Sequence, residues 1–331
     1  MQKPGLAKWM LIFSLGLYGC TAGRKIEPDT GVKARVLSLD LLDCFESGLT
    51  DEKGKPVFCE ASAVLNLGDK LVIANDKYIP GEGHNNVFSI DPVKVKNPRE
   101  LSASVMPYGR GLFNEASKLE SLAGNAAGDL FFAASAFDRI QTDSKAWDSY
   151  NMLFYWEKGK EDKPRLLYST EDEGIYSSKS LRPVFQTILR NWRYPRGVSY
   201  FKIEGLTVLP DNSLLFGIRE TGTDYQNAHP VFMIARAKFI KSPNGVTVDP
   251  VVEKIYEFET ANVKELDKTP GISSLEYHEA SNSIFIMTSW EKEGEPLETY
   301  FWNLPMESLR KQLPPILIRD DQGKPFSLPF K

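Results

Sequence analysis

Three glutamates stand at matching places in the chain, each at the start of an apolar segment. Glu60, Glu120 and Glu204 open three such segments, and Ser273 opens a fourth. Glutamate is depleted in strands, so three of them at equivalent places indicate more than strand formation. Carboxylate oxygens suit Ca²⁺ or Mg²⁺ better than Zn²⁺. We therefore expect the three glutamates to converge as metal ligands, with calcium as the candidate cofactor.

Basic side chains are the alternative to a metal ion. Two carboxylates about 4 Å apart repel each other by roughly 4 kcal/mol at an effective dielectric constant of about 20. A bound cation would offset this repulsion, and so would ion pairs with Lys77, Arg139 and Arg219. The sequence leaves both arrangements open.

Other polar residues are expected on the same face. The second segment of each repeat returns to the face where the first begins, and the loop that follows lies there too. Six further candidates for the ligand face are Asp76, Lys77, His84, Arg219, Glu220 and His229. His229 is the candidate proton carrier, but the sequence contains no nucleophile elbow, zinc-protease motif or phosphate-binding loop. The sequence thus indicates a ligand face without establishing a catalytic residue.

The segments that carry these residues repeat four times. Each repeat has a first strand, a turn rich in Gly, Asn or Asp, and a more apolar second strand. The repeats read CEASAVLNLGDKLVIANDK from Cys59, KLESLAGNAAGDLFFAASA from Lys118, KIEGLTVLPDNSLLFGIRE from Lys202 and GISSLEYHEASNSIFIMTSW from Gly271. Repeated four-stranded units that cannot bury both faces alone are typical of a β-propeller. In that fold the first strand lines the central channel, so the glutamates should meet at its mouth.

Further strands complete each unit. Third strands are expected at residues 86–90, 151–156, 231–235 and 299–302, and fourth strands at 165–169, 253–258 and 315–319. Residues 180–191 are expected to form a short helical insert, and residues 34–41 a strand that joins the last blade and closes the ring. The repeats lie farther apart than the roughly 40 to 50 residues of a compact blade. We predict an all-β propeller of four readable blades, with four to six possible, and a β-sandwich as the alternative.

The N-terminus has the pattern of an export signal. Residues 1–8 carry Lys3 and Lys8 and no acidic residue, and a short apolar run follows at residues 9–19. That run is shorter than the roughly 20 residues needed to span the bilayer core. A charged head followed by a short apolar run is typical of a cleaved signal peptide.

The end of this run adds a lipidation motif. Leu17-Tyr18-Gly19-Cys20 resembles the bacterial lipobox, in which the cysteine is acylated; an ordinary signal peptide is the alternative. Thr21 stands where an inner-membrane retention signal would place Asp, which favours the periplasmic face of the outer membrane. The predicted organisation is a lipoprotein signal peptide at 1–19, a lipidated Cys20 and tether at 20–33, and a single propeller domain at 34–331.

Composition and cysteine content limit the partners. The formal net charge of −4 gives no electrostatic attraction to nucleic acid, which we therefore exclude as a partner. We expect a monomer that meets the membrane through its lipid anchor and binds a small molecule or another envelope component. Cys44 and Cys59 are expected to form a disulfide in an oxidising compartment, with a metal site or reactive thiol as the alternative.

The third repeat resembles a known family. Ile203-Glu204-Gly205-Leu206-Thr207-Val208-Leu209-Pro210-Asp211, continued by Leu214-Leu215-Phe216-Gly217-Ile218-Arg219, is similar to the phytase-like propellers described as having esterase-like activity. The resemblance covers the four repeats, about half of the chain. It implies a Ca²⁺-dependent ester or phosphoester hydrolase, with the acidic role carried by Glu60, Glu120 and Glu204. Non-catalytic binding of a ligand at the channel mouth is the first functional hypothesis, and such a hydrolase is the second.

Overall fold

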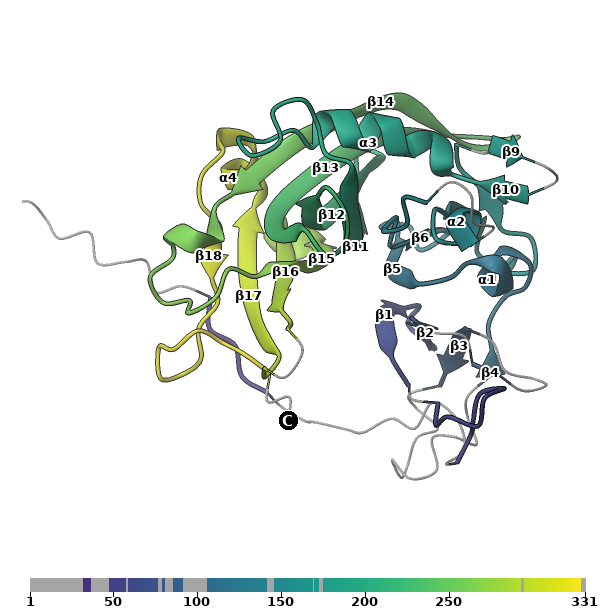
Figure 1. The fold of residues 1–331 in the computed structure, drawn as a ribbon, viewed down its shortest axis with the longest axis horizontal. Helices are drawn as coiled ribbons and strands as arrows, with labels where there is room; N and C mark the ends of the chain where they lie inside the picture. Colours follow the sequence, from purple (N-terminus) through teal and green to yellow (C-terminus); the bar gives the residue numbers. More distant parts are fainter. Residues whose placement is uncertain are drawn as a thin grey trace, which may run out of the picture.

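The fold is a ring of four antiparallel sheets (Figure 1). A computed structural model describes residues 32–36, 48–57, 59–76, 79–80, 86–91, 106–141, 146–168, 170–172, 175–292 and 295–328. Each sheet has four strands, and the first strand of each lies innermost in the ring. The chain is a four-bladed β-propeller, as predicted. In these residues no helix has both the length and the apolar character needed to cross a membrane.

Each blade is a meander in which consecutive strands pair. Blade 1 contains β1 (Ala61–Asn66), β2 (Leu71–Asn75), β3 (Val87–Ile90) and β4 (Met106–Pro107). Blade 2 contains β5 (Leu119–Gly124), β6 (Leu130–Ser135), β7 (Leu153–Glu157) and β8 (Arg165–Leu166). Blade 3 contains β11 (Tyr200–Val208), β12 (Ser213–Gly222), β13 (Ala228–Ser242) and β14 (Gly245–Phe258). Blade 4 contains β15 (Gly271–His278), β16 (Ser283–Trp290), β17 (Glu298–Pro305) and β18 (Ile316–Leu317).

Shorter elements connect the blades. The predicted helical insert is confirmed as a 3₁₀ turn at Lys179–Leu181 that continues into α3 (Arg182–Ile188). Other helices in the described residues are α1 (Leu112–Glu115), α2 (Ala146–Ser149) and α4 (Met306–Lys311), with 3₁₀ turns at Thr260–Asn262 and Glu279–Ser281. A small hairpin pairs β9 (Thr170–Asp172) with β10 (Ile175–Ser177). The expected third and fourth strands overlap the observed ones, but β4 was not foreseen because its two residues carry no periodic pattern.

The N-terminal segment reaches the last blade. Lys33 forms a parallel bridge with Arg319, and the amide of Ala34 donates to the carbonyl of Arg319 at 2.8 Å. This is the blade that the predicted closing strand was expected to join. The contact is a single bridge within residues 32–36, and residues 37–41 lie outside the described part of the chain.

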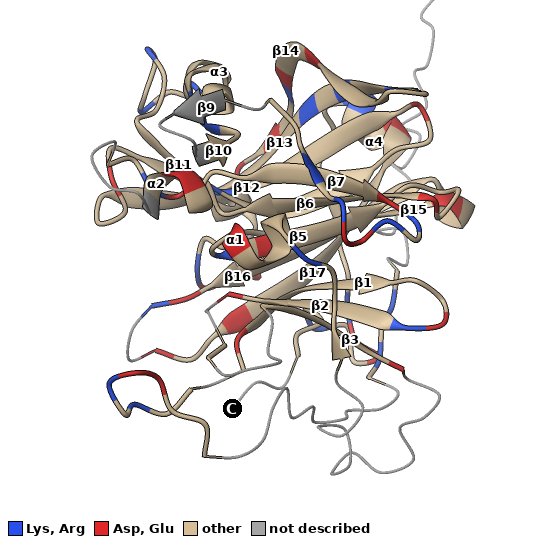
Figure 2. Cartoon of the chain, turned by 90° about the vertical axis from the view of Figure 1, so that its right-hand side faces the viewer, with Lys and Arg blue, Asp and Glu red and all other residues tan. Residues whose placement is uncertain are grey.

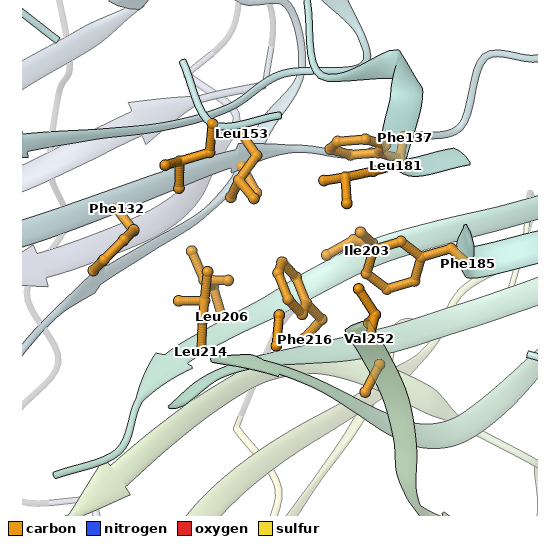
Figure 3. Packing of buried hydrophobic residues seen from close by; sticks show 14 of the residues in the cluster. Phe132, Phe137, Leu153, Leu181, Phe185, Ile203, Leu206, Leu214, Phe216 and Val252 are labelled. Atoms are coloured by element: carbon orange, nitrogen blue, oxygen red, sulfur yellow. The ribbon is translucent and has the colours of Figure 1, made fainter. Parts of the chain in front are cut away.

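Apolar clusters between neighbouring blades hold the ring together. All six residues of β6 are buried, because a propeller blade is covered on both faces and its strands need not alternate with polar residues. Phe132 and Leu153 of blade 2 pack toward Leu206 and Phe216 of blade 3 (Figure 3). Similar clusters join blade 1 to blade 2 and blade 3 to blade 4. Burying one such side chain stabilises the fold by about 1.5 to 3 kcal/mol.

Charged residues lie mainly at the strand ends and in the loops (Figure 2). The hairpin of β13 and β14 extends beyond its own blade and contacts blade 2 through polar groups. Lys241 Nζ lies 2.7 Å from Asp129 Oδ2, and the amide of Val246 donates to the hydroxyl of Tyr155 at 2.9 Å. At the hairpin turn Gly245 has φ +123°, and an added Cβ would lie 2.3 Å from the Tyr155 hydroxyl. The hairpin thus stabilises the interface between blades 2 and 3.

The predicted N-terminal features lie mostly outside the described residues. These include the signal peptide, Cys20 and the tether up to residue 31. Cys59 is disulfide-bonded, but Cys44, its expected partner, is also outside the described part of the chain. The pairing of Cys44 with Cys59 therefore stays a prediction.

Candidate functional site

All four innermost strands carry a β-bulge at the same place. In β1, β5, β11 and β15 the pairing with the next strand leaves out one residue, and these residues are Ser62, Glu120, Glu204 and Ser273. A bulge interrupts the ladder and re-aims the side chain of the extra residue. The bulge position is therefore occupied by a glutamate in blades 2 and 3 and by a serine in blades 1 and 4.

Glu60 does not occupy this position. The carbonyl of Glu60 accepts a hydrogen bond from the amide of Asp76 at 2.8 Å, just as the carbonyl of Lys118 accepts one from Ala136 at 3.0 Å. Glu60 is thus the structural equivalent of Lys118, and Ser62 is the equivalent of Glu120. Matching the glutamates by residue type misaligned blade 1, because the strand pairing and not the acid fixes the register.

A buried ion network joins the two acids. Lys202 of blade 3 pairs directly with Glu204, and its Nζ also lies 3.2 Å from Oε1 of Glu120 in blade 2. Arg219 Nη1 lies 2.5 Å from the other carboxylate oxygen of Glu204. The side chains of Glu120, Lys202, Glu204 and Arg219 are no more than 14% exposed. Basic side chains therefore offset the repulsion between these carboxylates. Of the ion pairs expected from the sequence, the pair of Glu204 with Arg219 is observed, whereas Glu120 pairs with Lys202 and Lys118 and not with Arg139.

The network shifts the protonation of its members. Burial raises the pKa of Glu120 to about 7, and the charges of Glu204 and Asp76 act in the same direction against Lys202 and Lys118. Burial alone would lower the pKa of Lys202, but Glu204 and Glu120 outweigh it and raise that pKa above its ordinary value. Near neutral pH the Glu120 carboxyl is therefore poised between its two forms, while Lys202 stays charged.

A calcium ion does not fit these carboxylates as they are arranged. Among the described residues, no group of three or more His, Cys, Asp or Glu is placed to hold a metal ion. Each oxygen of Glu204 already faces a cation, one from Lys202 and one from Arg219. Coordination would require both basic side chains to move away. Calcium thus stays a prediction from the sequence.

A cavity of about 730 Å³ lies where the innermost strands β5 and β11 of blades 2 and 3 begin. The residues that line it come from blades 2 and 3: Lys118, Asp138, Arg139, Ile140, Gln141, Tyr200, Lys202, Glu220, Asp224, Tyr225 and Gln226. A second cavity of about 320 Å³ shares Lys118 and Arg139 with it and includes Asp76. Lys202 belongs both to the cavity wall and to the ion network, so the two are physically connected.

Contacts between side chains fix the wall of the cavity of about 730 Å³. Asp138 Oδ2 lies 2.7 Å from Lys118 Nζ and 3.3 Å from Arg139 Nη1. The Arg139 guanidinium also stacks over the Tyr150 ring, 4.4 Å from its centroid. On the opposite side the Tyr200 hydroxyl donates to Glu220 at 3.1 Å, and burial raises the Tyr200 pKa so that the phenol keeps its proton. The wall therefore offers hydrogen-bond donors and acceptors side by side.

The structure brings some of the predicted residues together and separates others. Glu120, Glu204, Arg219 and Glu220 lie in one connected group, and Asp76 lines the adjoining cavity. Glu60 is half-buried, its amide donates to Asn75 Oδ1 at 2.7 Å, and it lines neither of these two cavities. His229 is exposed on β13 and does not line the described cavity, while Lys77 and His84 are outside the described residues.

Sequence reasoning missed the lysines. Lys118 and Lys202 each stand two residues before a motif glutamate, in Lys118-Leu119-Glu120 and Lys202-Ile203-Glu204. This shared Lys-x-Glu pattern was the available signal. It places a cation beside each carboxylate at the start of two neighbouring innermost strands.

Comparisons with known proteins give no family. No model of a protein family matches the sequence, and no curated protein matches it. Among solved structures, a nidogen/laminin complex aligns at 8% identity over 81% of this chain and 82% of the other, with a TM-score of 0.31. A GH43 β-1,3-galactosidase with galactodeoxynojirimycin aligns at 8% identity over 84% of this chain and 95% of the other, with a TM-score of 0.29. Alignments this weak carry no argument about ligand or activity.

Proposed function

We propose that this protein binds a small polar ligand at the mouth of the propeller channel. The observation that carries the proposal is the cavity of about 730 Å³ between blades 2 and 3. Its volume lies within the roughly 300 to 1,000 Å³ range of pockets that bind small molecules. Charged and aromatic side chains line it, and loops of two blades form its rim.

The cavity wall is organised before any ligand arrives. Lys118, Asp138 and Arg139 hold one another on one side, and Tyr200 holds Glu220 on the other. Side chains already fixed in place lose little conformational entropy when a ligand binds, so more of the interaction energy appears as affinity. A ligand-binding role therefore needs no rearrangement of the wall.

We further propose that Cys20 anchors the propeller at the bacterial envelope. The support is the charged head, the short apolar run and the lipobox-like residues that end at Cys20. Cys20→Ser should abolish incorporation of labelled palmitate and release the protein from the membrane fraction. A Cys20→Ser protein that still fractionates with membranes and carries label would refute the anchor.

Hydrolysis of an ester or phosphoester is the second candidate. One observation favours it: burial holds the Glu120 pKa at about 7, near the value that suits a general acid or base at neutral pH. Glu120 does not line the cavity and acts on it only through Lys202. Binding is therefore the function that the geometry supports best.

Arg139→Ala tests ligand binding at the cavity. Arg139 lies on the wall, and its side chain is 41% exposed, so its removal should leave the fold intact. A thermal-shift screen with a library of sugars, amino acids and phosphorylated metabolites should give stabilising compounds whose effect the variant loses. Arg236→Ala is the matched control, since that partly exposed arginine pairs with Glu253 away from the cavity. No stabilising compound, or equal stabilisation of both variants, would contradict the proposal.

A further inference from the structure

We infer that the ligand of this cavity is a neutral saccharide, and that the ring of Tyr225 is the surface on which a sugar stacks. The inference rests on the proposed binding function and names its ligand class. Two independent features support it: the charge balance of the wall and the exposed aromatic ring at the rim.

The charges that line the cavity cancel. The basic residues are Lys118, Arg139 and Lys202, and the acidic residues are Asp138, Glu220 and Asp224. An anionic ligand would compete with Asp138 for Lys118 and Arg139, and a cationic ligand would compete with Lys118 for Asp138. Breaking such partly buried pairs costs free energy, so the wall favours neither sign of charge.

A neutral hydroxyl group suits this wall. A hydroxyl donates one hydrogen bond and accepts others, so it can bond to a carboxylate and to an ammonium group together. Gln141 and Gln226, which also line the cavity, present amides that both donate and accept. A ligand with several adjacent hydroxyls could therefore join the existing pairs without separating them.

Tyr225 supplies the apolar part of the site. It lines the cavity, and 68% of its surface is exposed and so accessible to a ligand. The face of a sugar ring that carries C–H groups is apolar and can cover such a ring, while the hydroxyls at the sugar's edge remain free for the polar wall.

The loop that carries Tyr225 is held in place. Asp224 Oδ1 accepts hydrogen bonds from the amides of Gln226 and Asn227, both at 2.9 Å. The side chain of Gln226 donates to the Tyr225 hydroxyl at 3.0 Å. At the base of the loop, a Cβ on Gly222 would lie 2.4 Å from the carbonyl oxygen of Asn227. These hydrogen bonds hold the loop, and the one from Gln226 holds the Tyr225 ring at the rim of the cavity.

Calorimetry of the mature protein with defined oligosaccharides tests this inference. The probes are maltotetraose, cellotetraose, mannotetraose and the tetramer of N-acetylglucosamine, which distinguish neutral glucans and mannans from cell-wall amino sugars. Inositol hexakisphosphate is the charged contrast. We expect at least one saccharide to bind with a Kd below about 5 mM. Tyr225→Ala should weaken that binding at least tenfold, whereas Tyr225→Phe should retain most of it.

Trp192→Ala is the matched control. Trp192 is 75% exposed, stacks with Arg193 and does not line the described cavity, so its loss should leave saccharide affinity unchanged. The inference is overturned if no saccharide binds, or if Tyr225→Ala binds as well as the original protein. Binding of inositol hexakisphosphate alone, lost in Arg139→Ala, would overturn the saccharide and leave the proposed binding function standing.

Discussion

The Nζ atom of Lys202 lies 3.2 Å from Oε1 of Glu120, although the two residues belong to different blades. The same ammonium group pairs with Glu204 in its own blade. One lysine thus links the innermost strands of blades 2 and 3 where they meet the cavity. A change in the charge of Glu120 therefore alters the electrostatic interaction across this blade interface and with Lys202 in the cavity wall.

Glu120→Gln should flatten the pH dependence of stability. The folded-state pKa of Glu120 is raised from 4.5 to about 7, so folding favours the protonated form. The stabilisation from this group is fully present below about pH 4.5 and is lost as the pH rises through 7. Glutamine cannot ionise. Between about pH 4.5 and 8 the free energy of unfolding of the variant should therefore rise relative to that of the original protein by on the order of 3 kcal/mol.

Urea denaturation across that pH range measures the effect. Glu253→Gln is the control, because Glu253 is an exposed strand residue of blade 3 whose variant should follow the original protein. If the Glu120→Gln profile instead runs parallel to that of the original protein, Glu120 is ionised throughout this range and folding does not raise its pKa.

Replacing Arg219 alone should destabilise the fold more than replacing both Arg219 and its partner Glu204. Arg219→Met leaves Glu204 buried with only Lys202 as a cationic neighbour among the described residues. Breaking a buried pair from one side typically costs about 3 to 5 kcal/mol. The double variant Glu204→Gln/Arg219→Met removes both charges and should be more stable than Arg219→Met alone.

Chemical denaturation of these variants separates the two contributions. Arg236→Met is the matched control, since its pair with Glu253 is partly exposed and should contribute less than about 1 kcal/mol. A double variant that is less stable than Arg219→Met would show that Glu204 contributes through contacts other than this pair.

The blade count could be predicted because the turns recur in sequence. Gly68, Asn212 and Asn282 adopt positive φ between the first and second strands of blades 1, 3 and 4, and residues that favour this conformation are visible without a structure. The bulge could not be predicted, because its position accepts Ser62 as well as Glu120. The sequence therefore matched Glu60 with Glu120 by residue type, whereas its backbone hydrogen bond makes it equivalent to Lys118.

The site was harder to predict than the fold for a related reason. The contact of Lys202 with Glu120 joins residues far apart in the chain, and it depends on how two blades pack. Sequence patterns describe neighbours along one strand, so they showed the acids and missed the cations that pair with them. That Tyr225 lines the cavity depends on the conformation of its loop, which hydrogen bonds within the loop hold.

Gly205→Ala should destabilise the contact between blades 3 and 4. A Cβ at Gly205 would lie 2.7 Å from Cγ of Leu275 and 3.2 Å from Cα of Gly217. Overpacking of this kind typically costs about 1 to 3 kcal/mol. The midpoint of urea unfolding measures it, with Gly124→Ala as a milder control because its nearest neighbours are Phe131 ring atoms at 3.1 Å. Equal stability of the two variants would mean that the innermost strands can move apart easily.

Calcium and chelator should leave the melting temperature unchanged. A ligand that binds the folded state stabilises it in proportion to the logarithm of its concentration over Kd, so a calcium site would raise the melting temperature on titration. The carboxylates at the channel mouth instead face Lys202 and Arg219, which already supply the compensating positive charge. Differential scanning calorimetry with EDTA and then with millimolar CaCl₂, together with elemental analysis of protein purified without chelator, decides between the two arrangements. A calcium-dependent rise that Glu204→Gln abolishes would show that the ion pairs open to admit a metal.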